Sequence, residues 1–123
     1  MNKLNPLASI EESVAQFARD RDWDQFHTPK NLILAATAEM GELAEVLQWK
    51  SDEEVASFLK SDEGKNKLSE EVADVVIYLI RLCQKSEISL VNAISDKLLV
   101  NSKKYPIDLS RGNSKKYSER SND

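Results

Sequence analysis

Hydrophobic residues recur every three or four positions through most of the chain, the spacing of one face of an α-helix. This pattern predicts five helices, at about residues 6–20, 28–49, 52–60, 65–85 and 89–104. Thr28 and Pro29 stand where an N-cap and a first helical turn favour them. Only three glycines and three prolines interrupt the chain, which favours long helices over the frequent turns of a β fold. We therefore expect an all-α fold.

The length of 123 residues is that of a single domain. We expect this domain to span residues 1–110 and to be followed by a polar C-terminal arm at residues 111–123. A domain this small buries limited apolar surface alone, so self-association is a reasonable expectation.

The net charge of −4 indicates that a nucleic acid polymer is not the partner, because such binding needs an extended basic face. The chain has one cysteine, which excludes an intrachain disulfide and a cysteine-based metal site. No apolar run approaches the roughly 20 residues needed to span a bilayer, and the first residues do not resemble a signal peptide. We expect a cytoplasmic protein with no membrane partner.

Two predicted helices carry the same arrangement of acids at the edge of their apolar stripe. Glu39 and Glu42 stand three residues apart in the second helix, and Glu71 and Asp74 do so in the fourth. Side chains three apart share a helix face, so antiparallel packing would bring four carboxylates together. Such a cluster needs compensation, and all-oxygen ligands favour a hard divalent cation such as Mg²⁺.

The same acids are open to other interpretations. A single E-x-x-E pair most often decorates a solvated helix, whereas two copies at apolar edges favour a functional site. A di-iron carboxylate centre would need Glu-x-x-His pairs, and the only histidine, His27, lies outside both helices. In the fifth helix, Lys97, Asn101 and Lys104 share a face, which is typical of a solvated flank but would also suit phosphate oxygens.

The stretches "EMGE", "EEVAD", "KLLVNSKKYP" and "WDQFHTPKNLILA" together resemble the MazG-like all-α nucleotide pyrophosphohydrolases, most closely the dCTP pyrophosphatase branch. The similarity runs from about residue 7 to about residue 119. It implies a bundle of four to five helices that forms dimers or tetramers, so that a pocket can take residues from two chains.

The resemblance also implies Mg²⁺-dependent hydrolysis, with Mn²⁺ as an alternative ion, of a nucleoside triphosphate to the monophosphate and pyrophosphate. The favoured substrate is dCTP or a modified dCTP. The metal ligands and catalytic residues would be Glu39, Glu42, Glu71 and Asp74. The substrate would be held by Trp23, His27, Trp49, Tyr78, Lys97, Asn101, Lys104 and Tyr105. The general base stays open between Glu42 and Glu45.

Two features depart from the closest relatives of this branch. The segment between Trp49 and Leu68 is short, which leaves the base preference open. Arg81 follows Asp74 on the fourth helix and could pair with an acid or reach a phosphate. The alternatives are the same chemistry on dUTP, a non-canonical purine triphosphate or phosphoribosyl-ATP, or a non-enzymatic helical assembly module. Trp23, His27 and Trp49 would each be structural in such a module.

Overall fold

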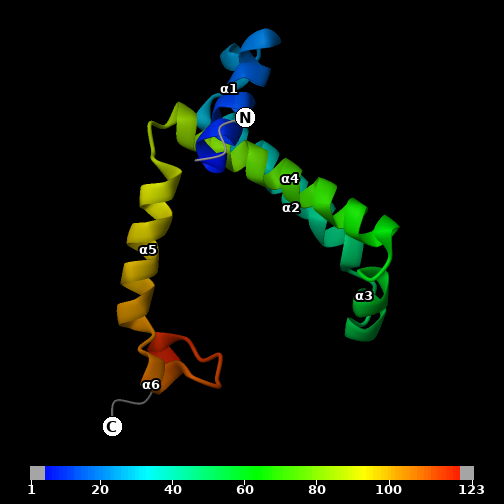
Figure 1. Ribbon diagram of the computed structural model, residues 1–123, viewed down its shortest axis with the longest axis vertical. Coiled ribbons are helices and arrows are strands. Elements are labelled where there is room, and N and C mark those ends of the chain that lie inside the picture. The colour runs from blue at the N-terminus through cyan, green and yellow to red at the C-terminus, as the bar shows by residue number, and fades with distance from the viewer. Residues whose placement is uncertain (1–4, 120–123) are drawn as a thin grey trace. The chain divides into compact units, whose positions relative to one another are not determined.

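The computed structural model describes residues 5–119, which form helices and their connections (Figure 1). Between residues 5 and 119, six α-helices and two 3₁₀ helices follow one another. They are α1 (Pro6–Asp20), η1 (Asp24–Phe26), α2 (Pro29–Leu47), α3 (Asp52–Phe58), α4 (Asp62–Lys85), α5 (Leu90–Lys104), α6 (Ile107–Ser110) and η2 (Tyr117–Glu119). No strand occurs within this range, so the all-α prediction is confirmed.

The packing divides the chain into two units, residues 1–88 and residues 89–123. The first unit contains α1 to α4, and the second contains α5, α6 and η2. The predicted domain boundary at residue 110 stays a prediction, because a division of packing within a chain does not define a functional domain.

The centre of the first unit is the pair formed by α2 and α4, which lie side by side and run in opposite directions (Figure 1). Leu32 of α2 and Ile80 of α4 are almost fully buried, and Ala36 packs beside them. Burying a side chain of that size stabilises a fold by roughly 1.5–3 kcal/mol. α1 packs against α4 and buries Ala18. This pairing brings the acidic edges of α2 and α4 together.

Side-chain caps fix where the helices begin. Thr28 Oγ1 accepts a hydrogen bond from Asn31 N at 3.2 Å, as the sequence predicts for the start of α2. Ser51 and Glu54 form a reciprocal capping box at α3. Each of these bonds satisfies a backbone N–H that has no partner within its helix.

The start of α4 differs from the prediction. The segment read as a loop before residue 65 already belongs to the helix, which begins at Asp62. Ser61 Oγ caps it by accepting from Gly64 N at 3.0 Å. Gly64 is required there because a Cβ would lie 2.0 Å from the carbonyl oxygen of Phe58. The glycine that suggested a loop is instead the residue that lets α4 start against α3.

In the second unit, the chain after α5 turns back onto the end of that helix. The rings of Tyr105 and Tyr117 meet edge to face at 6.1 Å, and Lys104 Nζ lies 5.0 Å from the centre of the Tyr117 ring. The short helix α6 was not predicted; it follows Pro106 directly, a residue suited to a helix start. The last four residues of the predicted polar arm lie outside the described residues.

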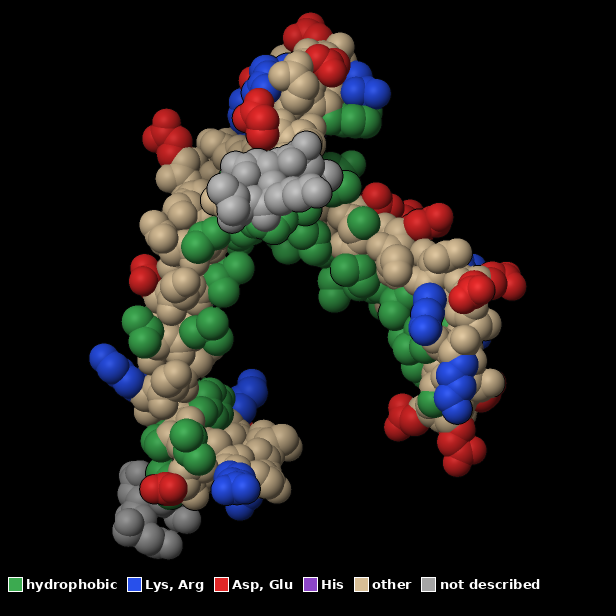
Figure 2. All heavy atoms as spheres, in the orientation of Figure 1, with side chains coloured by type: hydrophobic (Ala, Val, Ile, Leu, Met, Phe, Trp, Pro, Cys, Tyr) green, Lys and Arg blue, Asp and Glu red, His purple; other side chains and the backbone are tan. Residues whose placement is uncertain are grey.

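Large hydrophobic side chains remain exposed along α2, α4 and α5 (Figure 2). They include Leu34, Met40 and Val76 in the first unit and Ile94 and Leu98 in the second. Apolar surface of this extent is what self-association would cover, although the dimer or tetramer itself stays a prediction. None of the helices between residues 5 and 119 combines the length and the apolar character of a membrane-spanning segment.

Candidate functional site

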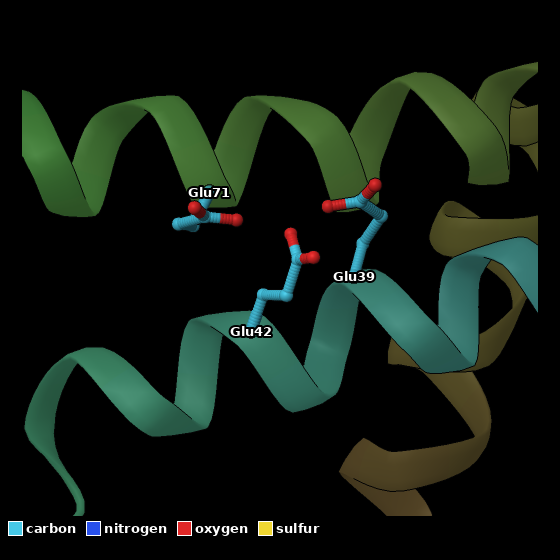
Figure 3. Close-up of side chains that lie close together, drawn as sticks. All are labelled: Glu39, Glu42 and Glu71. Atoms are coloured by element: carbon cyan, nitrogen blue, oxygen red, sulfur yellow. The ribbon is translucent and has the colours of Figure 1, made fainter.

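Three carboxylates meet at the contact between α2 and α4 (Figure 3). Glu39 and Glu42 project from successive turns of α2, and Glu71 projects towards them from α4. One oxygen from each lies within 4.8 Å of the others. We call these three residues the acidic cluster. It is a candidate metal-binding site built from the two sequence patterns that predicted it.

The charges of the acidic cluster act on one another. The pKa of Glu39 is raised, first by its hydrogen-bonding contact with the Glu42 carboxyl group, then by burial and by neighbouring negative charges. The pKa of Glu71 is raised mainly by burial and then by the charges of Glu42 and Asp74. Asp74 is not one of the three clustered residues, yet its negative charge contributes to the raised pKa of both Glu39 and Glu71. The site therefore favours binding a positive charge.

Two oxygens of the acidic cluster have no hydrogen-bond partner. Among residues 5–119, only three buried side-chain polar atoms lack one, and they include Glu39 Oε2 and Glu71 Oε2. Nearly all buried polar atoms in folded proteins are paired, so such exceptions indicate an interaction with something else. An all-oxygen set with two unsatisfied buried oxygens fits a hard divalent cation.

A cavity of about 460 Å³ borders the acidic cluster. Its polar lining includes Glu39, Asp74 and Tyr78, and α1 contributes apolar side chains such as Ile10 and Val14. Trp23 and His27, from the connector between α1 and α2, complete the wall. The structure thus brings five predicted site residues to one cavity, which has a size suited to a small organic ligand.

Aromatic rings line the part of this cavity formed by the connector. The Trp23 ring meets Phe17 edge-on at 5.8 Å and His27 at 6.3 Å. Trp23 is 44% exposed, so its ring contacts these neighbours and still remains accessible in part. A supported and accessible indole can stack on a planar heterocycle.

Comparison with known proteins agrees with this geometry. The sequence model of the MazG-like family matches residues 34–119. The chain is 43% identical over 113 residues, 92% of its length, to the dCTP pyrophosphatase 1 proteins of Bos taurus and Homo sapiens. It belongs to the MazG-like family. The resemblance seen in the sequence is therefore confirmed.

The relatives extend beyond the matched region. The chain spans about two thirds of their length, 67% of the bovine protein and 66% of the human one. Among solved structures, it is similar to a pyrophosphatase from Archaeoglobus fulgidus, with 36% sequence identity and a TM-score of 0.73. That match covers 86% of this chain and 94% of the archaeal chain, so nearly all of the archaeal chain has a counterpart here.

Arg81 of this MazG-like chain pairs with an acid, one of the two roles that the sequence left open, but the acid lies in a different segment from the one beside it on the helix. Arg81 is only 5% exposed, and its ion-pair partner is Asp24, with Nη2 to Oδ1 at 2.5 Å, rather than the nearby Asp74. Arg81 Nε also donates to His27 Nδ1 at 3.1 Å. The arginine thus ties α4 to the connector. The sequence allowed an acidic partner for Arg81, but it does not identify which acid.

The charge of Arg81 affects both of its partners. The pKa of Asp24 is lowered, chiefly by the hydrogen bond from Arg81. The pKa of His27 is also lowered, first by burial and then by the positive charge of Arg81. Both effects favour the neutral form of the imidazole in this wall of the cavity.

Five further residues were predicted to bind substrate. Trp49 follows α2 at its far end, is 88% exposed and does not line the cavity. Helix α2, which separates His27 from Trp49, is about 28 Å long at 1.5 Å per residue. The two side chains of one chain therefore cannot both contact the same nucleobase. Lys97, Asn101, Lys104 and Tyr105 belong to the second unit. Their role in binding substrate stays a prediction.

Proposed function

We propose that this MazG-like protein hydrolyses dCTP, or a modified dCTP, to the monophosphate and pyrophosphate with Mg²⁺, for which Mn²⁺ can substitute. The enzyme class, a nucleoside triphosphate pyrophosphohydrolase, rests on the family membership and on relatives named dCTP pyrophosphatase. The choice of base and of metal is our inference.

The observation that carries this proposal is the position of the acidic cluster. The cluster has two unsatisfied buried oxygens, from Glu39 and Glu71, and Glu39 also lines a cavity that has an aromatic wall. A triphosphate needs cationic compensation and a base needs a stacking surface, and this site provides for both. We assign the metal to Glu39, Glu42 and Glu71, with Asp74 as the fourth ligand.

The reaction follows from what these groups can do. A bound divalent cation supplies charge neutralisation for the triphosphate and activation of the attacking water. Water attacks the α-phosphorus, and the bond from that phosphorus to the bridging oxygen breaks, so the electron pair leaves with pyrophosphate. Glu42 or Glu45 accepts the proton of the water. Positioning and electrostatics provide most of the rate enhancement in such reactions.

The substrate contacts are those that the family resemblance implies. Trp23 and His27 contact the base, and Tyr78 borders the sugar. Lys97, Asn101, Lys104 and Tyr105 contact the phosphates or the sugar, and Trp49 contributes to base binding from a second copy. We expect a homodimer or homotetramer, because exposed apolar side chains follow α2, α4 and α5. A cytoplasmic location and the absence of a nucleic acid partner stay predictions.

The base preference is the part for which alternatives remain. Stacking tolerates every base, so an aromatic wall serves dUTP or a non-canonical purine triphosphate as well as dCTP. The cytosine preference is supported by the relatives named dCTP pyrophosphatase 1. A non-enzymatic helical module is disfavoured by the enzyme class of those relatives.

A direct assay tests this proposal. The purified protein is incubated with each canonical triphosphate and Mg²⁺ in ¹⁸O-labelled water, and the products are separated by anion exchange and weighed by mass spectrometry. We expect monophosphate carrying the label, unlabelled pyrophosphate, and the highest kcat/KM with dCTP or 5-methyl-dCTP. Release of orthophosphate, label in pyrophosphate, or no turnover with any nucleotide would contradict it. EDTA should abolish turnover, and added Mg²⁺ should restore it.

A further inference from the structure

The contact between Arg81 and His27 constrains where the histidine carries its proton. Arg81 Nε donates to His27 Nδ1 at 3.1 Å. A guanidinium has only N–H donors and remains protonated in proteins, so the nitrogen facing it must be an acceptor. A neutral imidazole that accepts at Nδ1 carries its hydrogen on Nε2. The ring therefore has one defined donor left.

Arg81 is itself held in place by its other nitrogens. Nη2 donates to Asp24 Oδ1 at 2.5 Å, and Nη1 donates to Gln84 Oε1 at 2.8 Å. Gln84 in turn donates from Nε2 to the carbonyl oxygen of Glu11 in α1 at 2.7 Å. With 5% of its surface exposed, the arginine is enclosed by the residues that hold these bonds. The contact is thus built into the packing of α1, α4 and the connector.

His27 lines the cavity next to Trp23, and Nδ1 is occupied by the arginine. We propose that Arg81 is a positioning residue that fixes His27 as the Nε2-protonated tautomer, so that this wall of the cavity presents a hydrogen-bond donor to the substrate base. This inference rests on the proposed function. It explains how the enzyme would distinguish one nucleobase from another.

A hydrogen-bond donor fixed at His27 Nε2 favours a nucleobase that places an acceptor atom opposite it. Cytosine carries an acceptor at N3, where uracil carries an N–H donor. Two donors facing each other leave both unpaired, and a site built for a hydrogen bond rejects a ligand that cannot form it. Stacking on Trp23 cannot make that distinction. The tautomer of His27 is therefore a device for specificity that does not depend on the metal.

The first test needs no substrate. His27 is the only histidine of the chain, so in the full-length protein without a histidine tag, long-range ¹H–¹⁵N correlation spectra report its tautomer without further assignment. In wild type we expect Nδ1 to resonate as an unprotonated nitrogen and Nε2 as a protonated one. In Arg81→Met both nitrogens should move towards the average of two tautomers, and Arg81→Lys, which keeps a donor-only head group, should restore part of the wild-type pattern.

A matched control separates this effect from the loss of an ion pair. Lys85 Nζ lies 3.4 Å from the same Asp24 oxygen, so Lys85→Met removes a cation from that carboxylate without removing a donor from His27. This variant should keep the wild-type tautomer. A wild-type spectrum with Nδ1 protonated, or an Arg81→Met spectrum identical to wild type, would overturn the proposal. If Arg81→Met does not fold, the protonation of Nδ1 in the wild-type spectrum alone decides the test.

The second test measures selectivity. The ratio of kcat/KM for dCTP to that for dUTP should fall about tenfold in Arg81→Met, the effect expected of one hydrogen bond, and should stay within about twofold of wild type in Lys85→Met. If the His27 tautomer changes in Arg81→Met but the ratio of kcat/KM values does not, the link between the tautomer and base specificity is overturned. Failure of wild type to hydrolyse any nucleotide would instead count against the proposed function, because the spectra stand without it.

Discussion

Glu39 and Glu71 face each other across the contact between α2 and α4, and each buries one carboxylate oxygen that has no hydrogen-bond partner. Their pKa values are both raised, in part by the negative charge of Glu42. A protein that places three carboxylates so close weakens its own fold unless a cation joins them. Substitutions at these residues should therefore affect metal binding, catalytic activity and the stability of the fold together.

Replacing Glu71 by glutamine should lower kcat/KM by at least about 100-fold, the scale of losing one group that stabilises a charged transition state. The change keeps the shape of the side chain and removes the charge that would hold the metal. Steady-state assays with dCTP and Mg²⁺ measure the effect. Glu70→Gln is a matched control, because it removes the charge of an exposed neighbour on the same helix. Equal activity of the two variants would contradict the assignment of the ligands.

The same substitution should stabilise the protein when no metal is present. A raised pKa means that the carboxyl group contributes stability below its unfolded pKa of about 4.3, and that this contribution is lost as the pH rises through the folded value. In EDTA at pH 7, Glu71→Gln should therefore melt at a higher temperature than wild type. The difference should shrink towards pH 4.

Saturating Mg²⁺ should reverse that order. A ligand at 100 times its Kd stabilises the folded state by about 2.7 kcal/mol, and only the wild-type cluster keeps the charges to bind it. Thermal unfolding followed by circular dichroism, with and without Mg²⁺, gives both differences. A wild-type melting temperature that does not change when Mg²⁺ is added would argue against a metal at these residues.

The acidic cluster could be predicted from sequence because it is built from local spacing. Glu39 and Glu42 share a face of one helix at any tertiary arrangement, and an apolar stripe beside each acid pair indicates which edges meet. The family resemblance added Trp23 and His27 to the same site, and the structure places both at the cavity beside Glu39.

Contacts between distant segments could not be predicted in this way. Arg81 and Asp24 are brought together by packing of the connector on α4, and no periodicity relates the two positions. The start of α4 was also misplaced, since the close approach of Gly64 to Phe58 depends on how α3 and α4 meet. Propensity alone reads Ser-Asp-Glu-Gly as a loop, and tertiary contact decides for helix.

Asp24 should make the stability of the protein sensitive to acid. The Arg81 hydrogen bond lowers its pKa, so its contribution is present above its unfolded pKa of about 3.9 and is lost as the pH falls through the folded value. Asp24→Asn should therefore be less stable than wild type at pH 7, with a difference that shrinks in strong acid. Urea unfolding at a series of pH values measures this, and Asp96→Asn, on the exposed surface of α5, is the control.

Gly64→Ala should destabilise the first unit by roughly 1–3 kcal/mol, the usual cost of overpacking. The added Cβ would lie 2.0 Å from a backbone carbonyl oxygen, which cannot move aside as a flexible side chain would. Gly41→Ala is the matched control, because a Cβ there meets no atom within 4 Å and alanine is the better helix former. Chemical denaturation should show a loss of stability for the first variant and none for the second.

Trp49 should act on substrate only from a second copy of the chain. It is 88% exposed and lies at the opposite end of α2 from His27, so Trp49→Ala should raise KM for dCTP by about tenfold if a neighbouring chain receives it, the scale of lost stacking. Glu71→Gln is inactive in its own site but keeps its tryptophan. Mixing the two variants under conditions that exchange subunits should therefore create sites with wild-type KM, each combining the acids of one chain with the Trp49 of the other. A mixture that behaves as the sum of its separate components would show that Trp49 does not complete the site of a partner.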